Sequence, residues 1–64
     1  MKKQRLIILP HDVSMVTGKS IRASQRLLKD IHFALGKLPH QPVSVREFAD
    51  YMGLEVEEVE RVIG

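Results

Sequence analysis

A cluster of basic, amide and hydroxyl side chains lies between residues 19 and 29, mostly at the spacing of one helix face. An arginine fork suits O6 and N7 of guanine, and a glutamine amide suits N6 and N7 of adenine. Lysines more commonly meet phosphates, which position a protein on a duplex and make its affinity depend on salt. The cluster therefore suits contacts with duplex DNA, and its members are Lys19, Ser20, Arg22, Gln25, Arg26 and Lys29.

Two helices are expected to position this cluster. The first spans residues 11–17, with Asp12 near its N-terminus, and ends at Gly18, which is free to adopt a positive φ. Ser20 is expected to cap a second helix over residues 21–35. Its apolar stripe has one polar gap at Ser24 and comprises Ile21, Ser24, Leu27, Leu28, Ile31, Ala34 and Leu35. Its opposite face carries the basic side chains together with Gln25 and His32.

The remaining chain predicts a short strand, a loop and two more helices. Leu6–Leu9 is a short aliphatic run that suits a strand ending at Pro10, and Val43 is a candidate to pair with it. Two prolines make residues 37–42 a loop. Ser44 and Glu47 form a capping-box pattern before a helix over 45–52. Gly53 ends that helix, and a fourth follows over 56–63.

An internal repeat appears when Gly18 is aligned with Gly53. Each half is then a short helix, a glycine turn and a second helix. The aligned segments include residues 12–14 with 47–49, Arg26 with Arg61, and residues 27–28 with 62–63. The chain is therefore expected to contain two similar helix pairs.

Residues 12–28 contain, in order, a small residue, a turn glycine, a capping residue, a basic residue and an aliphatic pair. These are Ser14, Gly18, Ser20, Arg26 and Leu27–Leu28. This order resembles the helix-turn-helix regulators of bacteria and phages, most of all the excisionase and small-regulator branch. The resemblance implies that the helix over 21–35 is a recognition helix. It covers about a quarter of the chain.

Two residues depart from the family pattern. Lys19 stands where an aliphatic residue usually plugs the turn, and Ser24 stands where an apolar residue usually packs. The second unit keeps the pattern better, with Leu54 as its plug and Val59 packed. Its last helix is rich in glutamate, however, and would repel phosphate.

Charge is divided unevenly along the 64 residues. Residues 1–38 hold eight Lys or Arg and two Asp, a net charge of +6, whereas residues 39–64 carry a net charge of −4. The basic half suggests a polyanionic partner. Two solvated faces that attract each other, within a chain or between chains, remain an alternative explanation. The solvated face of an amphipathic helix is likewise an alternative for the basic side chains of residues 22–29.

The N-terminal arm adds three further candidate DNA contacts, Lys2, Lys3 and Arg5. These side chains could follow the backbone or reach into a minor groove. A disordered solubilising tail is the alternative.

Small size and the absence of cysteine predict a partner subunit. A chain of this length buries only roughly 60% of its unfolded surface, and small domains usually need a disulfide, a metal or a partner. With no Cys, disulfides are excluded. The histidines His11, His32 and His40 match no ligand spacing, so no metal and no cofactor are expected. A homodimer is the remaining means of stabilisation.

Other classes of protein find little support in the sequence. No nucleophile–base set or phosphate-cradling glycine loop is present, so the chain is not expected to be an enzyme or to take a small-molecule substrate. No apolar run approaches the roughly 18 residues of a membrane span, and cytoplasmic location is expected. The aromatic residues are expected in buried places. Phe33 is expected to pack under the N-terminal strand or against another subunit. Phe48 and Tyr51 are expected to lie in the core or in an interface.

The sequence thus predicts a single, mostly α domain of four short helices in two helix-turn-helix-like units, with a short N-terminal β-strand. Its parts are a basic arm and strand (1–10), a first unit (11–36), a loop (37–44) and a second unit (45–64). The expected function is sequence-specific binding of duplex DNA through residues 21–35, in transcriptional regulation or as an accessory factor in recombination. A protein-interaction module that uses the basic and acidic faces without binding DNA is the alternative.

Overall fold

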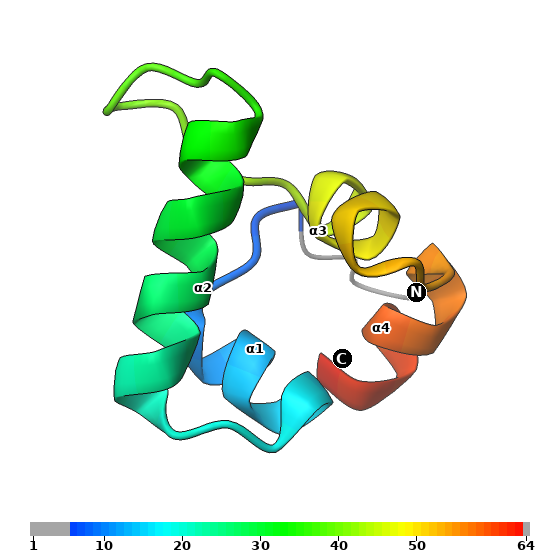
Figure 1. Cartoon of the computed structure of the whole chain (residues 1–64). Coiled ribbons are helices and arrows are strands. Elements are labelled where there is room, and N and C mark those ends of the chain that lie inside the picture. The colour runs from blue at the N-terminus through cyan, green and yellow to red at the C-terminus, as the bar shows by residue number, and fades with distance from the viewer. Residues whose placement is uncertain (1–5, 64) are drawn as a thin grey trace.

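Four α-helices account for most of the chain in a computed structural model that describes residues 6–63 (Figure 1). They are α1 (Pro10–Thr17), α2 (Ile21–Ala34), α3 (Val45–Met52) and α4 (Val56–Ile63). The prediction of a mostly helical chain with four helices is confirmed. The bounds of α3 and α4 agree with those expected, and α1 and α2 differ from expectation by one residue each.

The predicted N-terminal strand is absent from the part of the chain that the structure describes. A single antiparallel bridge, Ile7 to Ser44, takes its place. It is flanked by bonds from the Ile8 N–H to the Val43 oxygen (3.1 Å) and from the Val45 N–H to the Leu6 oxygen (2.9 Å). The segment does not extend into a strand because its next N–H, that of Leu9, donates to a side chain of α1, and Val45 already begins α3.

Local sequence signals explain where the helices begin and end. α1 starts one residue earlier than predicted, at Pro10, because the fixed φ of proline suits the first position of a helix, where no N–H is needed. At the ends of α1 and α3, Gly18 and Gly53 adopt left-handed conformations with φ of 78° and 74°. Side chains larger than glycine are strained in this region, so each glycine is the residue that lets the chain turn.

When the chain is shifted by 35 positions, the bounds of α1 coincide with those of α3, and α2 and α4 begin at aligned residues. α1 and α3 have eight residues each, both end at a left-handed glycine, and both lead through three residues into the next helix. Aligned positions are also buried together: Val13 with Phe48, and Ser24 with Val59, are all fully buried. The internal repeat predicted from the sequence is therefore present in the helix bounds and in the core.

The core is built from both halves of the chain. Its fully buried apolar side chains include Val13 of α1, Ile31 of α2, Phe48 of α3 and Val59 of α4. Ile8 and Val43, which meet at the bridge, complete it at 3% and 5% exposure. The short extended segment therefore contributes one buried aliphatic side chain rather than a sheet.

The helices do not contact one another equally. α1 packs against both α2 and α4, and α3 packs against α4, whereas α3 makes no comparable contact with α2. α2 is also the longest helix, with 14 residues against eight in each of the others. In Figure 1 it stands along one side of the molecule, away from α3 and α4. One side of α2 is thus left open to solvent or to a partner.

Candidate nucleic-acid interface

The outer face of α2 carries a stripe of three basic side chains and one aromatic side chain. Arg22, Arg26, Lys29 and Phe33 follow one another at intervals of four, three and four residues, which places them on one face of the helix. The buried side chains of α2, Ser24 and Ile31, lie on the opposite face. All four members of the stripe are exposed. The stripe therefore points away from the core along the whole length of the helix.

No ion pair between residues 6 and 63 neutralises the basic members of this stripe. The one salt bridge found there joins Lys37 to Glu47 and involves neither Arg22, Arg26 nor Lys29. Three cations that are exposed and unpaired on one helix create a positive surface that an external anion can approach.

Hydroxyl groups fix the turn that leads into α2. The Ser14 hydroxyl donates to the Lys19 oxygen (2.7 Å), and the Lys19 N–H donates to the Thr17 hydroxyl (3.2 Å). Ser20 then caps α2 by accepting the Ala23 N–H (3.1 Å), as predicted. In the second turn Leu54 packs against the core as an aliphatic plug. Side-chain hydrogen bonds thus hold the first turn, where the family pattern has an aliphatic residue.

Ser24 fills the polar gap in the apolar stripe without leaving an unsatisfied group. Its side chain is fully buried, and its hydroxyl donates to the Ser20 oxygen at 2.8 Å. A buried hydroxyl costs little when it is hydrogen-bonded, and this bond to the carbonyl four residues earlier is common for serine in helices. The departure at this position is therefore compatible with the packing of α2.

The structure brings six of the nine predicted site residues together at the start and along the outer side of α2. Lys19 and Ser20 lie exposed in the turn, and Arg22 and Arg26 line a shallow depression with Ser20 and Ala23. Gln25 and Lys29 are exposed about one and two helical turns after Arg22. The remaining three, Lys2, Lys3 and Arg5, lie outside the described residues.

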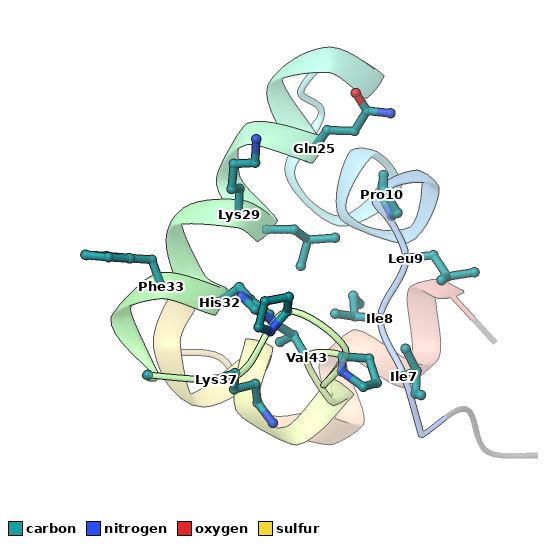
Figure 2. Close-up of a pocket in the computed structure, with 14 residues that line it drawn as sticks. Ile7, Ile8, Leu9, Pro10, Gln25, Lys29, His32, Phe33, Lys37 and Val43 are labelled. Atoms are coloured by element: carbon teal, nitrogen blue, oxygen red, sulfur yellow. The ribbon is translucent and has the colours of Figure 1, made fainter.

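Sequence reasoning missed an apolar groove beside α2. Its volume is about 850 Å³, and it lies between α2, residues 7–9 with the first residue of α1, and the loop after α2 (Figure 2). The loop is held against the helix by a hydrogen bond between His32 Nε2 and the Gln41 oxygen (2.8 Å). Apolar lining residues include Ile7, Leu9, Pro10, Leu28, Phe33, Pro39, Pro42 and Val43. The two prolines of the loop are the one signal in the sequence that could have pointed to it.

Phe33 is the most exposed apolar side chain of the described residues, at 86%. It lines the rim of the groove and points outward, away from the other labelled residues (Figure 2). The prediction that it packs under the N-terminal strand is wrong, because that segment lies on the other side of the groove. Phe48 is fully buried as expected, whereas Tyr51 is 47% exposed and does not belong to the core.

The carboxylate of Glu47 has a lowered pKa because two donors converge on it. The Ser44 N–H donates to Glu47 Oε1 at 2.9 Å, and Lys37 Nζ lies 3.0 Å from the same oxygen. Donation from Ser44, followed by that from Lys37, lowers the pKa of Glu47 below its ordinary value of 4.5. Lys37 therefore lines the groove as half of an ion pair, which leaves Lys29 as the unpaired lysine at this site.

Two further features bear on the kind of protein this is. Within residues 6–63, no three His, Cys, Asp or Glu side chains gather where they could hold a metal ion. No helix in this range is long and apolar enough to cross a bilayer. Comparisons with protein-family models, with curated proteins and with solved structures gave no match for this chain.

Proposed function

We propose that this protein binds duplex DNA with α2 as the recognition helix of a helix-turn-helix unit formed by α1, the turn at residues 18–20 and α2. The observation that carries the proposal is the stripe of Arg22, Arg26 and Lys29, which is exposed and free of ion pairs within residues 6–63. A duplex offers a regular row of phosphates and base edges to such a helix, and the major groove is wide enough to admit it.

Each side chain has a role in this proposal that follows from its place along the helix. The N-terminal half of a recognition helix reaches the base edges, so Arg22, Gln25 and Arg26 read bases. Lys19 and Lys29 contact phosphates on either side of the major groove of the DNA. The turn before α2 is fixed by the hydroxyls of Ser14 and Thr17, which reduces the ordering that binding requires.

The second helix pair has a different role, although it repeats the first. Glu57 of α4 occupies the position that Arg22 occupies in α2, and Glu57 and Glu58 are both exposed. Carboxylates on this face repel phosphate, so α4 does not enter a DNA groove. The second pair instead supplies Phe48 and Val59 to the core that holds α2 in place.

A homodimer completes the proposal. Two copies related by a two-fold axis present two α2 helices, and their target is a pseudo-palindrome whose half-sites lie about one helical turn apart. Such a protein acts as a small transcriptional regulator or as an accessory factor in recombination.

The deciding experiment measures fluorescence anisotropy of a labelled, mixed-sequence duplex at two salt concentrations. Affinity is expected to fall steeply with salt, as phosphate neutralisation requires. On a mixed-sequence duplex the two arginines have no specific bases to read and contact phosphates instead. The double variant Arg22→Ala/Arg26→Ala should therefore lose most binding and reduce the slope of log K against log [salt] by about 2. Its matched control is Arg46→Ala/Arg61→Ala, which removes two exposed arginines from the second helix pair.

The control variant should bind like the unmodified protein, and both variants should retain its circular dichroism spectrum. Equal losses in the two double variants would mean that net charge, not α2, determines binding. No binding at low salt would reject the proposal and favour a role in protein interaction.

A further inference from the structure

We propose that a second copy of this chain covers the apolar groove beside α2, and that Phe33 of each copy enters the groove of the other. The proposal rests on the homodimer proposed above but not on DNA binding. It names the surface through which the two copies meet, and that surface consists of Phe33 and the groove that it borders.

The first reason is that the projecting side chain of Phe33 and the groove belong to the same surface. Phe33 lines the rim of the groove, is 86% exposed and points outward (Figure 2). A two-fold interface joins one patch to an identical patch, so it forms only where the patch is complementary to itself. When a second copy turns its rim toward the first, each Phe33 faces the opposite groove. One contact therefore forms twice and closes the assembly at two copies.

The second reason is the charge of the groove. Its lining includes Lys29, His32 and Lys37 but no carboxylate, and Glu47 already neutralises Lys37. The face of an aromatic ring is electron-rich and attracts a nearby ammonium group. A phenylalanine ring satisfies both the aliphatic floor and the unpaired Lys29. A basic segment would be repelled by Lys29, and an acidic segment would leave its carboxylates against the aliphatic floor.

The two rings alone do not bury the area of a stable dimer, so the contact must extend along the apolar lining of the groove. A phenylalanine side chain buries about 150–250 Å² when it is fully enclosed, so most of that area remains available on Phe33. Two rings and the two surfaces that receive them bury roughly 700 Å², about half of what a standard interface needs. Leu9 and Ile7, which line the groove at 49% and 39% exposure, extend the same surface.

This arrangement leaves Arg22 and Arg26 accessible to DNA, whereas Gln25 and Lys29 line the groove and lie at the border between the two proposed surfaces. Phe33 lies eleven residues beyond Arg22, about 16 Å further along the helix. A dimer contact at the C-terminal end of α2 therefore does not cover its N-terminal half. The two Arg22 side chains lie far from the contact, one in each copy.

Sedimentation equilibrium of the full chain without DNA, from about 1 to 100 µM, tests the association. The unmodified protein should be a dimer at the upper end of this range, and Phe33→Ser should weaken association at least 100-fold. Tyr51→Ser is the matched control, because Tyr51 is the other exposed aromatic residue and lies on α3. It should leave the dimer intact. A monomeric unmodified protein at 100 µM, or equal effects of the two substitutions, overturns the proposal.

Cross-linking locates the contact, and the absence of cysteine makes it simple to read. Asp30→Cys, which keeps Phe33 and places an exposed thiol three residues before it on α2, is mixed with a size-tagged Pro39→Cys chain and treated with a short bis-maleimide. Each chain holds one thiol, so a mixed product must join two copies. We expect this product to exceed that of Asp30→Cys with Glu58→Cys, whose thiol lies on α4. A dimer that cross-links through α4 instead refutes the proposed surface. The variant Arg22→Ala/Arg26→Ala should still dimerise, which separates this result from the DNA-binding proposal.

Discussion

The carboxylates of Asp12 and Glu47, 35 residues apart, make the same hydrogen bond at the start of two different helices. Asp12 Oδ2 accepts the Leu9 N–H, and Glu47 Oε1 accepts the Ser44 N–H, each at 2.9 Å. Only the second helix has the reciprocal bond, in which the Ser44 hydroxyl accepts the Glu47 N–H at 3.0 Å. The two halves thus begin alike, but α1 depends on a single side chain for its cap.

Removing the carboxylate of Asp12 should destabilise the protein markedly, although the side chain is small. Asp12 is 1% exposed, and its loss leaves the Leu9 N–H without its acceptor. Asp12→Ala is expected to lower the free energy of unfolding by about 1–3 kcal/mol, measured by urea denaturation. Asp12→Asn keeps an oxygen acceptor and should cost less. Asp50→Ala, at an exposed position of α3, serves as the control and should change stability little. Equal costs for Asp12→Ala and Asp12→Asn would contradict a capping role.

Stability should fall in mild acid, in part through Glu47. Its pKa is lowered in the folded protein by the Ser44 N–H and by Lys37, so the ionised form favours folding. This contribution is complete above the unfolded pKa of about 4.5 and is lost as pH falls through the lower folded value. Glu47→Gln should therefore show a shallower loss of stability below pH 5, and a loss of at most about 1 kcal/mol at pH 7 because the pair is partly exposed. Urea midpoints across pH 3–7 measure both effects. Glu57→Gln should retain the steeper profile of the unmodified protein, and a Glu47→Gln profile that matches it would argue against this assignment.

A larger side chain at Gly18 would meet no neighbouring atoms, but it would strain the backbone of the turn. No atom lies within 4 Å of a Cβ built there, so the whole cost comes from φ of 78°. Gly18→Ala is expected to lower stability by about 1–2 kcal/mol, and Gly18→Asn by less, because asparagine adopts this region more readily. Lys19→Ala, one residue further along the turn, should be close to neutral. Thermal unfolding followed by circular dichroism distinguishes them, and an unchanged melting temperature for Gly18→Ala would be inconsistent with the left-handed turn.

The helices could be predicted because their signals are local. Ser20 and Ser44 cap the helices that follow them, and Gly18 and Gly53 end the helices that precede them. Each signal acts within four residues, so a single sequence contains all the information needed. The strand over Leu6–Leu9 was predicted wrongly for the opposite reason. A strand needs a partner of matching length, and only one bridge forms before Val45 begins α3.

The groove could not be predicted because it depends on contacts between distant segments. It exists because His32 holds Gln41, and because Ile8 meets Val43 across the bridge. The pairing of residues 6–9 with Val43 is expected from the sequence and is present as the Ile8–Val43 bond, whereas the bond between His32 and Gln41 does not follow from periodicity. The place of Phe33 on the polar side of the helix indicates that it avoids the core of its own chain, and its 86% exposure agrees with this. Periodicity alone does not indicate that it borders a groove.

The repeat permits a gain-of-function test of DNA binding that does not disturb α2. Arg61 of α4 already aligns with Arg26, and Glu57 and Glu60 align with Arg22 and Gln25. Glu57→Arg/Glu60→Gln therefore gives α4 the counterparts of Arg22, Gln25 and Arg26, but not those of Lys19 and Lys29. If these side chains bind DNA, affinity for a mixed-sequence duplex should rise and the salt slope should steepen by about 1 for the added phosphate contact. Glu57→Gln/Glu60→Gln removes the same two carboxylates without adding a cation, so it should raise affinity less and leave the slope nearly unchanged. Anisotropy titrations at several salt concentrations separate these outcomes. Identical slopes for the two double variants would show that only repulsion was relieved, and that the position of the arginine on the repeated helix carries no binding of its own.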